Sequence, residues 1–113
     1  MGWVGVAWNG GSAYAKAMAI YLISPLTERS DLLDAAVERQ IAAPTDRYRL
    51  PAGRGWLIRF PGTSVELSNH VGITGQAEGA PALLGSALVI PVTAYYGRGP
   101  TEMWEWLKTR FEQ

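Results

Sequence analysis

Three side chains that can do acid–base or nucleophilic chemistry stand at every second position of one segment: Glu66, Ser68 and His70. On a β-strand this spacing places all three on one face. A carboxylate, a hydroxyl and an imidazole are the groups used in nucleophilic hydrolysis, and an unperturbed histidine titrates near neutral pH. However, Cα atoms two positions apart on a strand are almost ~7 Å apart and their side chains point in parallel. Since a general base must lie within hydrogen-bond reach of its nucleophile, the solvated face of a half-buried strand is the structural alternative.

A second group of residues is typical of an anion-binding turn. The segment Gly97–Thr101 precedes the last helix, where free backbone N–H groups, a guanidinium and a hydroxyl favour a bound anion. A tight turn with Pro100 at the first helical position explains the same residues. The candidate ligand- or anion-binding residues are Arg59, Tyr95, Tyr96, Arg98 and Thr101.

The final helix carries a wide aromatic face. At 100° per residue its apolar side chains fill an arc of roughly 160°, whereas a helix packed on one core needs an apolar stripe of about 100°. The excess predicts an interface with another protein molecule, and a homodimer in particular. The alternative is that these rings form the core of their own chain. The predicted interface residues are Met103, Trp104, Trp106, Leu107 and Phe111.

Basic residues gather in the middle of the chain, where Arg47, Arg49, Arg54 and Arg59 are interleaved with Tyr48 and Trp56. Arginines with aromatics can bind single-stranded nucleic acid. The formal net charge of the whole chain is +0, which argues against a nucleic-acid partner.

Composition excludes several kinds of site. The chain has no cysteine and one histidine, so a disulfide scaffold, a thiolate centre and a histidine-rich zinc site are ruled out. We therefore expect no metal and no cofactor. The apolar run from Gly79 to Tyr96 is interrupted by glycines and prolines, which argues against a membrane helix. With no signal-peptide pattern at the start, we expect a cytoplasmic protein with no membrane partner.

The periodicities predict one α+β domain over residues 1–113. We expect an antiparallel sheet of about five strands, covered on one face by two helices, in the order β-β-α-β-β-β-α. Asn9-Gly10 predicts a hairpin turn between a strand at Trp3–Trp8 and one at Tyr14–Ile23. Because Ser12 could instead cap a helix over that second segment, the order β-α-α-β-β-β-α stays open. The later elements are a helix from Ser24-Pro25 to Ile41, strands at 46–60, Val65–Ile73 and Ala87–Tyr96, a long connection at 74–86, and the final helix after Pro100.

These observations lead to two functional hypotheses. The preferred one is a binding or interaction module that forms a homodimer through the final helix or an edge strand, with any small-molecule ligand beside Tyr95, Tyr96 and His70. The alternative is a small hydrolase or nuclease in which His70 acts with Glu66 or Ser68 and an arginine holds the substrate anion.

Overall fold

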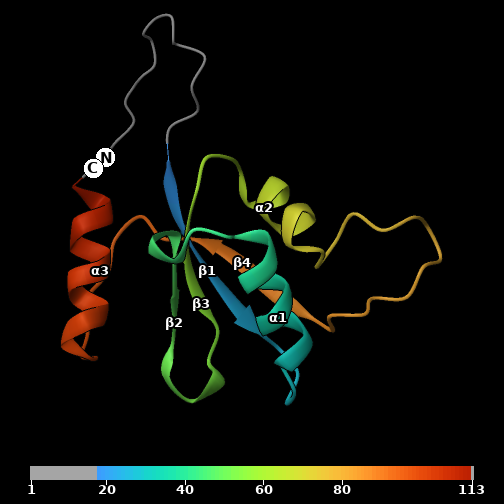
Figure 1. Cartoon of the computed structure of the whole chain (residues 1–113), viewed down its shortest axis with the longest axis horizontal. Helices are drawn as coiled ribbons and strands as arrows, with labels where there is room; N and C mark the ends of the chain where they lie inside the picture. Colours follow the sequence, from blue (N-terminus) through green and yellow to red (C-terminus); the bar gives the residue numbers. More distant parts are fainter. Residues whose placement is uncertain (1–17, 113) are drawn as a thin grey trace, which may run out of the picture.

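The computed structural model describes residues 18–112 (Figure 1). These residues form a four-stranded antiparallel sheet, and three α-helices accompany it. Two single 3-10 turns lie at Pro44–Asp46 and Pro51–Gly53. In chain order the elements are β1 (Ala19–Pro25), α1 (Asp31–Gln40), β2 (Arg47–Arg49), β3 (Trp56–Phe60), α2 (Ser64–Val71), β4 (Ala87–Pro91) and α3 (Thr101–Phe111).

The first six elements form two interleaved β-α-β units. β1 and β2 lie on either side of β3, and β3 and β4 lie on either side of β1. Every neighbouring pair is antiparallel, which is the split β-α-β, or ferredoxin-like, topology. α3 follows as an additional helix. The α+β class and the antiparallel sheet are as predicted, with four strands among residues 18–112 where about five were expected over the whole chain.

The sheet is covered on both faces, which corrects the prediction that its helices cover one face only. Successive residues of a strand point to opposite faces. One face, called here the helix-pair face, packs against α1 and α2 through the main core of the protein. Its largest fully buried side chains come from both strands and helices: Ile23, Leu33, Ile58, Leu67 and Val37.

The opposite face, called here the α3 face, carries a smaller core. Ile20 and Leu57 point to this side and pack with Trp106 and Leu107 of α3. In Figure 1, α3 (red) lies apart from α1 and α2, next to β2. The final helix therefore uses part of its apolar arc to cover its own sheet.

The predicted strand at Val65–Ile73 is wrong, because Ser64–Val71 is helix α2. A capping box starts this helix: the Glu66 backbone N–H donates to Thr63 Oγ1 at 3.1 Å, and the Thr63 N–H donates to Glu66 Oε1 at 2.9 Å. Gly72 ends it in the left-handed conformation at φ 104°. Both are standard helix boundary signals, and they outweigh the alternation of polar and apolar residues between them.

Other boundaries differ in detail. β1 confirms the predicted strand over Ala19–Ile23, while the predicted strand at Trp3–Trp8, the Asn9-Gly10 turn and residues 14–17 lie outside the described residues. Ser24 and Pro25 belong to β1, so the first helix begins later than predicted, at Asp31. The segment 46–60 is a hairpin of two strands, β2 and β3, and the strand predicted at Ala87–Tyr96 ends at Pro91.

Candidate interaction surface

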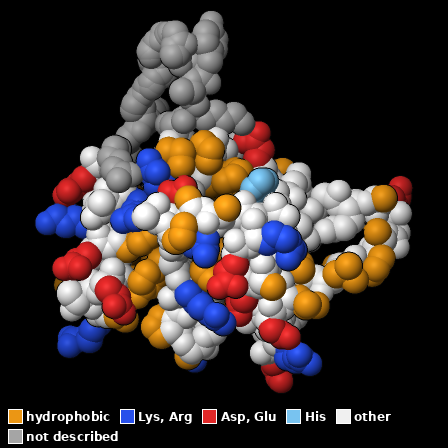
Figure 2. Space-filling model, in the orientation of Figure 1, with side chains coloured by type: hydrophobic (Ala, Val, Ile, Leu, Met, Phe, Trp, Pro, Cys, Tyr) orange, Lys and Arg blue, Asp and Glu red, His pale blue; other side chains and the backbone are white. Residues whose placement is uncertain are grey.

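Helix α2 places two of the three catalytic candidates, Glu66 and His70, on the same face of the helix. Glu66 and His70 are four residues apart and share a helix face, and both line a shallow hollow of about 500 Å³ together with Phe60, Pro61 and Gly62. The histidine is exposed at the surface in Figure 2 (pale blue). Ser68 is buried and its hydroxyl contacts Thr74 Oγ1 at 2.7 Å. The helix therefore separates the serine from the other two groups.

The two titratable side chains of this hollow each have a structural contact. His70 Nε2 lies 2.9 Å from the backbone oxygen of Gln40 at the end of α1; because a carbonyl only accepts, this nitrogen carries the proton. The imidazole also packs on Phe60, with ring centroids 5.5 Å apart. Glu66 holds the cap of α2 through the Thr63 N–H. The residues of the hollow thus connect the C-terminal ends of α1 and α2, and they include a carboxylate and an imidazole on one helix face.

Tyr21 contacts Gly62, one of the residues that line this hollow, and was not among the sequence candidates. Its hydroxyl donates a hydrogen bond to the backbone oxygen of Gly62. Burial raises the pKa of the Tyr21 hydroxyl above its usual value, and the nearby Glu66 carboxylate raises it further. A tyrosine in the middle of an apolar strand looks like an ordinary core residue, so only the packing reveals this contact.

Arg59 does not join His70. It follows Ile58 and precedes Phe60 on β3, so its side chain points to the α3 face while Phe60 points to the helix-pair face with His70. The guanidinium lies 3.3 Å from Asp46 Oδ1. The predicted combination of His70 with the anion-binding arginine Arg59 is therefore divided by the sheet.

The remaining anion candidates flank α3. Tyr95 packs on Trp104, with centroids 5.9 Å apart, and on Phe111, with centroids 5.0 Å apart. Tyr96 is fully exposed, and Arg98 and Thr101 are exposed as well. The structure brings Tyr95 into an aromatic cluster and leaves its neighbour Tyr96 in solvent.

The predicted interface residues of α3 divide into two groups. Trp106 and Leu107 are buried against the sheet, so they are not available to a partner. Arg110 closes over the Trp106 ring at 4.8 Å and donates two hydrogen bonds to the Thr45 backbone oxygen. Met103, Trp104 and Phe111 are half-buried and keep part of their surface exposed.

Two of the central arginines hold this fold together. Arg47 donates to the backbone oxygens of Ile41 and Ala42, at 2.6 and 3.1 Å. Arg49 donates to the buried Asp34 at 2.8 Å and lies over the Trp56 ring. These contacts give the basic cluster a structural role within the chain.

The outer side of β4 is one of the two edges of the sheet formed by residues 18–112. The Val92 N–H donates to the Ile20 oxygen and the Leu26 N–H to the Ser86 oxygen, both at 2.8 Å. Even-numbered residues of this strand therefore face β1, because backbone groups alternate along an antiparallel ladder. The odd-numbered Ala87, Val89 and Pro91 direct their backbone groups away from the sheet.

Nothing within residues 18–112 is hydrogen-bonded to this outer side of β4. Ala87 and Val89 each present one N–H and one carbonyl, and Pro91 presents a carbonyl only. A proline fits there because no donor is needed on an edge. The strand also contains no charged side chain, and charged side chains are the usual protection of an edge against pairing.

Apolar side chains accompany this edge. Leu88 pairs with Ser24 and Ile90 with Leu22, so both point to the α3 face. They are 50% and 40% exposed. Directly after the strand, Val92 packs in the α3 cluster. The exposed apolar strip is therefore continuous with the half-buried rings of α3.

A second hollow, of about 430 Å³, lies at the chain segment before β4. Its apolar walls are Leu32 at the start of α1 and the Leu83–Gly85 turn. Leu32 and Leu83 are 61% and 72% exposed. Figure 1 shows the connection 72–86 projecting from the body, and apolar side chains gather along it in Figure 2.

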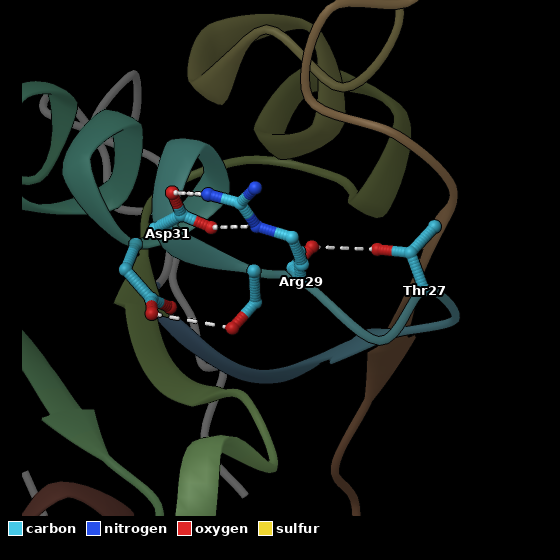
Figure 3. Close-up of polar contacts among 5 residues, drawn as sticks. Thr27, Arg29 and Asp31 are labelled. Atoms are coloured by element: carbon cyan, nitrogen blue, oxygen red, sulfur yellow. Dashed lines mark hydrogen bonds and ion pairs between the residues drawn. The ribbon is translucent and has the colours of Figure 1, made fainter.

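The polar rim of this hollow is an ordered turn (Figure 3). Thr27 Oγ1 donates to the Arg29 backbone oxygen at 2.8 Å. Arg29 donates to both carboxylate oxygens of Asp31, at 2.8 and 3.4 Å. Hydrogen bonding to Arg29 holds the pKa of Asp31 below its usual value. We call the whole depression, lined by Thr27, Arg29, Asp31, Leu32, Leu83, Leu84 and Gly85, the leucine hollow.

Comparison with known proteins returns no similarity: no protein-family model, no curated protein and no solved structure matches this chain. In the part of the chain that the structure describes, no three His, Cys, Asp or Glu side chains lie together as metal ligands would. No helix between residues 18 and 112 is long and apolar enough to span a membrane.

Proposed function

We propose that this protein is an interaction module that forms a homodimer by pairing the outer edge of β4 with the same edge of a second copy. The observation that carries the proposal is the uncharged edge at Ala87 and Val89, to which nothing within residues 18–112 is hydrogen-bonded, with Leu88 and Ile90 exposed beside it. The other sheet edge, β2, has only three residues and two of them are arginines. Short length and charge protect an edge from pairing, so β4 is the edge that is open to a partner.

A second copy suits this edge because a two-fold axis at Val89 makes the strand complementary to itself. In this register Val89 faces Val89 of the other copy, and Ala87 faces Pro91. Two N–H groups per copy then find acceptors, which gives four hydrogen bonds in the pair. On the α3 face, Leu88 meets Ile90 in a pair without backbone bonds, where side chains approach most closely. The formal net charge of +0 imposes no repulsion between copies.

The strength of the edge contact follows from its size. Leu88 and Ile90 are each about half exposed. Full burial of one such side chain is worth roughly 2 kcal/mol, so burying the exposed halves of both contributes about 2 kcal/mol per copy. Four hydrogen bonds add about 4 kcal/mol, and association costs at least ~4 kcal/mol. The edge alone thus supports a free energy of association near −4 kcal/mol, which corresponds to a Kd of about 1 mM.

Sedimentation equilibrium at protein concentrations up to about 1 mM tests the proposal. The informative variant is Val89→Pro, because this N–H points outward and its loss breaks no bond to β1. We expect Val89→Pro and Leu88→Lys to be folded monomers, and the control Val65→Lys, which replaces an apolar residue that is 66% exposed on α2, to dimerise like the wild type. A wild-type chain that stays monomeric at the highest concentration contradicts the proposal, as does unchanged dimerisation of Val89→Pro.

A second candidate function is acid–base catalysis at the α2 hollow, as in a small hydrolase or nuclease. It is supported by the common helix face of Glu66 and His70 and by the hollow of about 500 Å³ that they line. Hydrolysis of a nitrophenyl ester or phosphodiester is the test. We expect His70→Gln to abolish turnover and Glu78→Gln, an exposed carboxylate outside the hollow, to retain it. If the wild type hydrolyses neither substrate, this candidate is dropped.

A further inference from the structure

Helix α3 is attached to the sheet by a small part of its surface. Trp106 and Leu107 are the buried residues of α3, and they pack on Ile20 and Leu57 of the sheet. The other apolar side chains of the helix are half-buried. Isolated helices of fewer than ~12–15 residues are marginal in water, and α3 spans only Thr101–Phe111. The helix therefore depends on this small core for its stability.

The α3 face also contains buried polar groups that are not satisfied. Trp106 Nε1 is buried and has no hydrogen-bond partner in the part of the chain that the structure describes, and the same is true of Arg59 Nε. Arg59 pairs with Ile20 between β3 and β1, so it lies on the α3 face as well. A buried donor without an acceptor is destabilising, because it has given up its hydrogen bond to water. Movement of α3 away from the sheet returns water to the Trp106 N–H.

Polar contacts between α3 and the rest of the domain lie at exposed positions. Arg110 donates to the Thr45 backbone oxygen at 3.0 and 2.6 Å in an exposed position. Near the start of the helix, burial raises the pKa of the Tyr48 hydroxyl, and the exposed Glu102 carboxylate raises it further. An exposed hydrogen bond contributes on the order of a few-fold to an equilibrium constant, because water replaces it. These contacts therefore allow α3 to separate from the sheet.

The chain between β4 and α3 has the properties of a hinge. Val92 is fixed to the sheet, because its N–H donates to the Ile20 oxygen at 2.8 Å. Tyr95 is fixed to α3, because its ring packs on two rings of that helix. Thr93 and Ala94 lie between these two anchors and are exposed, and no backbone–backbone hydrogen bond joins them to another residue among 18–112. A rotation within these two residues moves Tyr95 and α3 together.

We propose that α3 is a hinged cover, which swings away from the sheet at Thr93 and Ala94 while the rest of the domain stays folded. In Figure 1, α3 lies apart from α1 and α2, which pack on the opposite face of the sheet. Opening uncovers Leu57, which Leu22 connects across the sheet to the exposed Ile90. The open state therefore presents a wider apolar surface than the closed one. The inference concerns a single copy of the chain, so it goes beyond the proposed pairing through β4 and does not depend on it.

Cysteine labelling at two neighbouring positions of β3 tests this opening, because the chain contains no cysteine. Leu57 is buried on the α3 face, and Ile58 is buried on the helix-pair face. Leu57→Cys and Ile58→Cys chains are each treated with a thiol reagent in native buffer, at a protein concentration far below the Kd of about 1 mM expected for pairing through β4. Each labelling rate is compared with the rate that global unfolding of the same variant predicts. We expect Leu57→Cys to exceed that rate at least about a hundredfold, and Ile58→Cys to match it.

A second substitution in each cysteine variant weakens the attachment of the helix. Arg110→Ala removes the two hydrogen bonds to Thr45, and we expect it to accelerate the labelling of Leu57→Cys about tenfold and to leave Ile58→Cys unchanged. The matched control is Lys108→Ala, which replaces an exposed side chain of the same helix and should change neither rate.

The inference is overturned if both cysteines are labelled at the rate of global unfolding, or if Arg110→Ala accelerates both equally, because α3 then leaves only when the whole domain unfolds. If the cysteine variants do not fold, hydrogen exchange of the wild type decides. Protection of the α3 amides at least about a hundredfold below that of β1 supports the cover, and equal protection overturns it. A wild-type chain that stays monomeric contradicts the β4 pairing and leaves this inference intact.

Discussion

Asp34 is expected to be the polar side chain on which the fold depends most. It is 8% exposed, and its carboxylate accepts from Trp56 Nε1 at 2.8 Å, from Arg49 Nη2 at 2.8 Å and from Ser30 Oγ at 3.3 Å. The carboxylate therefore ties α1 to both strands of the β2–β3 hairpin. Replacing it with alanine leaves the buried Trp56 N–H without an acceptor.

The expected loss follows from these partners. An unsatisfied buried donor costs about 1–3 kcal/mol. The ion pair with Arg49 adds only up to ~1 kcal/mol, because the Arg49 side chain is 53% exposed and solvent screens it. Asp34→Ala should therefore lower the free energy of unfolding by about 2–4 kcal/mol, a Tm decrease on the order of 10–25 °C for a domain of this size. Asp34→Asn keeps an acceptor for the indole and should lose about 1 kcal/mol.

Urea denaturation followed by far-UV circular dichroism measures this series. The control is Asp31→Asn, which removes an exposed carboxylate that pairs with an exposed Arg29; because solvent screens this pair, we expect a much smaller loss of unfolding free energy than in Asp34→Ala. The reasoning is refuted if Asp34→Ala loses less than about 1 kcal/mol, or if Asp34→Asn is as damaging as alanine. The first result would mean that water replaces the carboxylate as the acceptor of the Trp56 N–H. The second would mean that the negative charge of Asp34 contributes more to the free energy of unfolding than its hydrogen bond to Trp56.

Three further predictions concern other parts of the fold. Thr63→Ala removes the cap of α2 and should cost about 0.5–2 kcal/mol in urea denaturation; an unchanged unfolding midpoint would show that the helix does not need the cap. Gly55→Ala should prevent folding or lower the Tm by more than about 10 °C. Gly55 has φ +117°, and a Cβ there would lie 2.0 Å from the Ile23 backbone oxygen. In the control Gly79→Ala the new Cβ meets nothing within 4 Å, so the free energy of unfolding should fall only by the ~1–2 kcal/mol that a left-handed backbone conformation costs. Tyr21 has a raised pKa, so its neutral form is favoured in the folded state; its contribution is complete below pH ~10 and is lost as the pH rises through the raised folded value. Tyr21→Phe should therefore flatten the loss of stability between about pH 9 and 12, and an equally steep loss in the variant would rule out this role for Tyr21.

Helix α2 shows how far local patterns could be read. The alternation of Glu66, Ser68 and His70 with apolar residues predicted a strand, and the same residues at helical spacing form α2. The signal that distinguishes the two was present in the sequence, as Thr63 followed three positions later by Glu66 and a glycine at position 72. An eight-residue segment gives too little periodicity to separate the two patterns, so the boundary residues should have been given more weight.

The division of α3 into a buried and a half-buried part required the three-dimensional structure. Its five apolar residues looked equivalent on the helix. Which of them cover the sheet depends on how the helix lies against Ile20 and Leu57, more than 40 positions away in the chain. The opposite directions of Arg59 and His70 were equally hidden, because they follow from the pairing of β3 and from the helical state of α2.

The sequence by itself determined the class of the fold, the antiparallel character of the sheet, the helix after Pro100 and the absence of cysteine chemistry. Those properties depend on composition and on periodicity within single segments, which the order of residues contains directly. The tertiary structure alone decided that helices cover both faces of the sheet and that β4 lies at an edge of the sheet formed by residues 18–112. Edges and faces arise when distant segments pair, and no local pattern at Ala87–Pro91 records which of its two sides will find a neighbour.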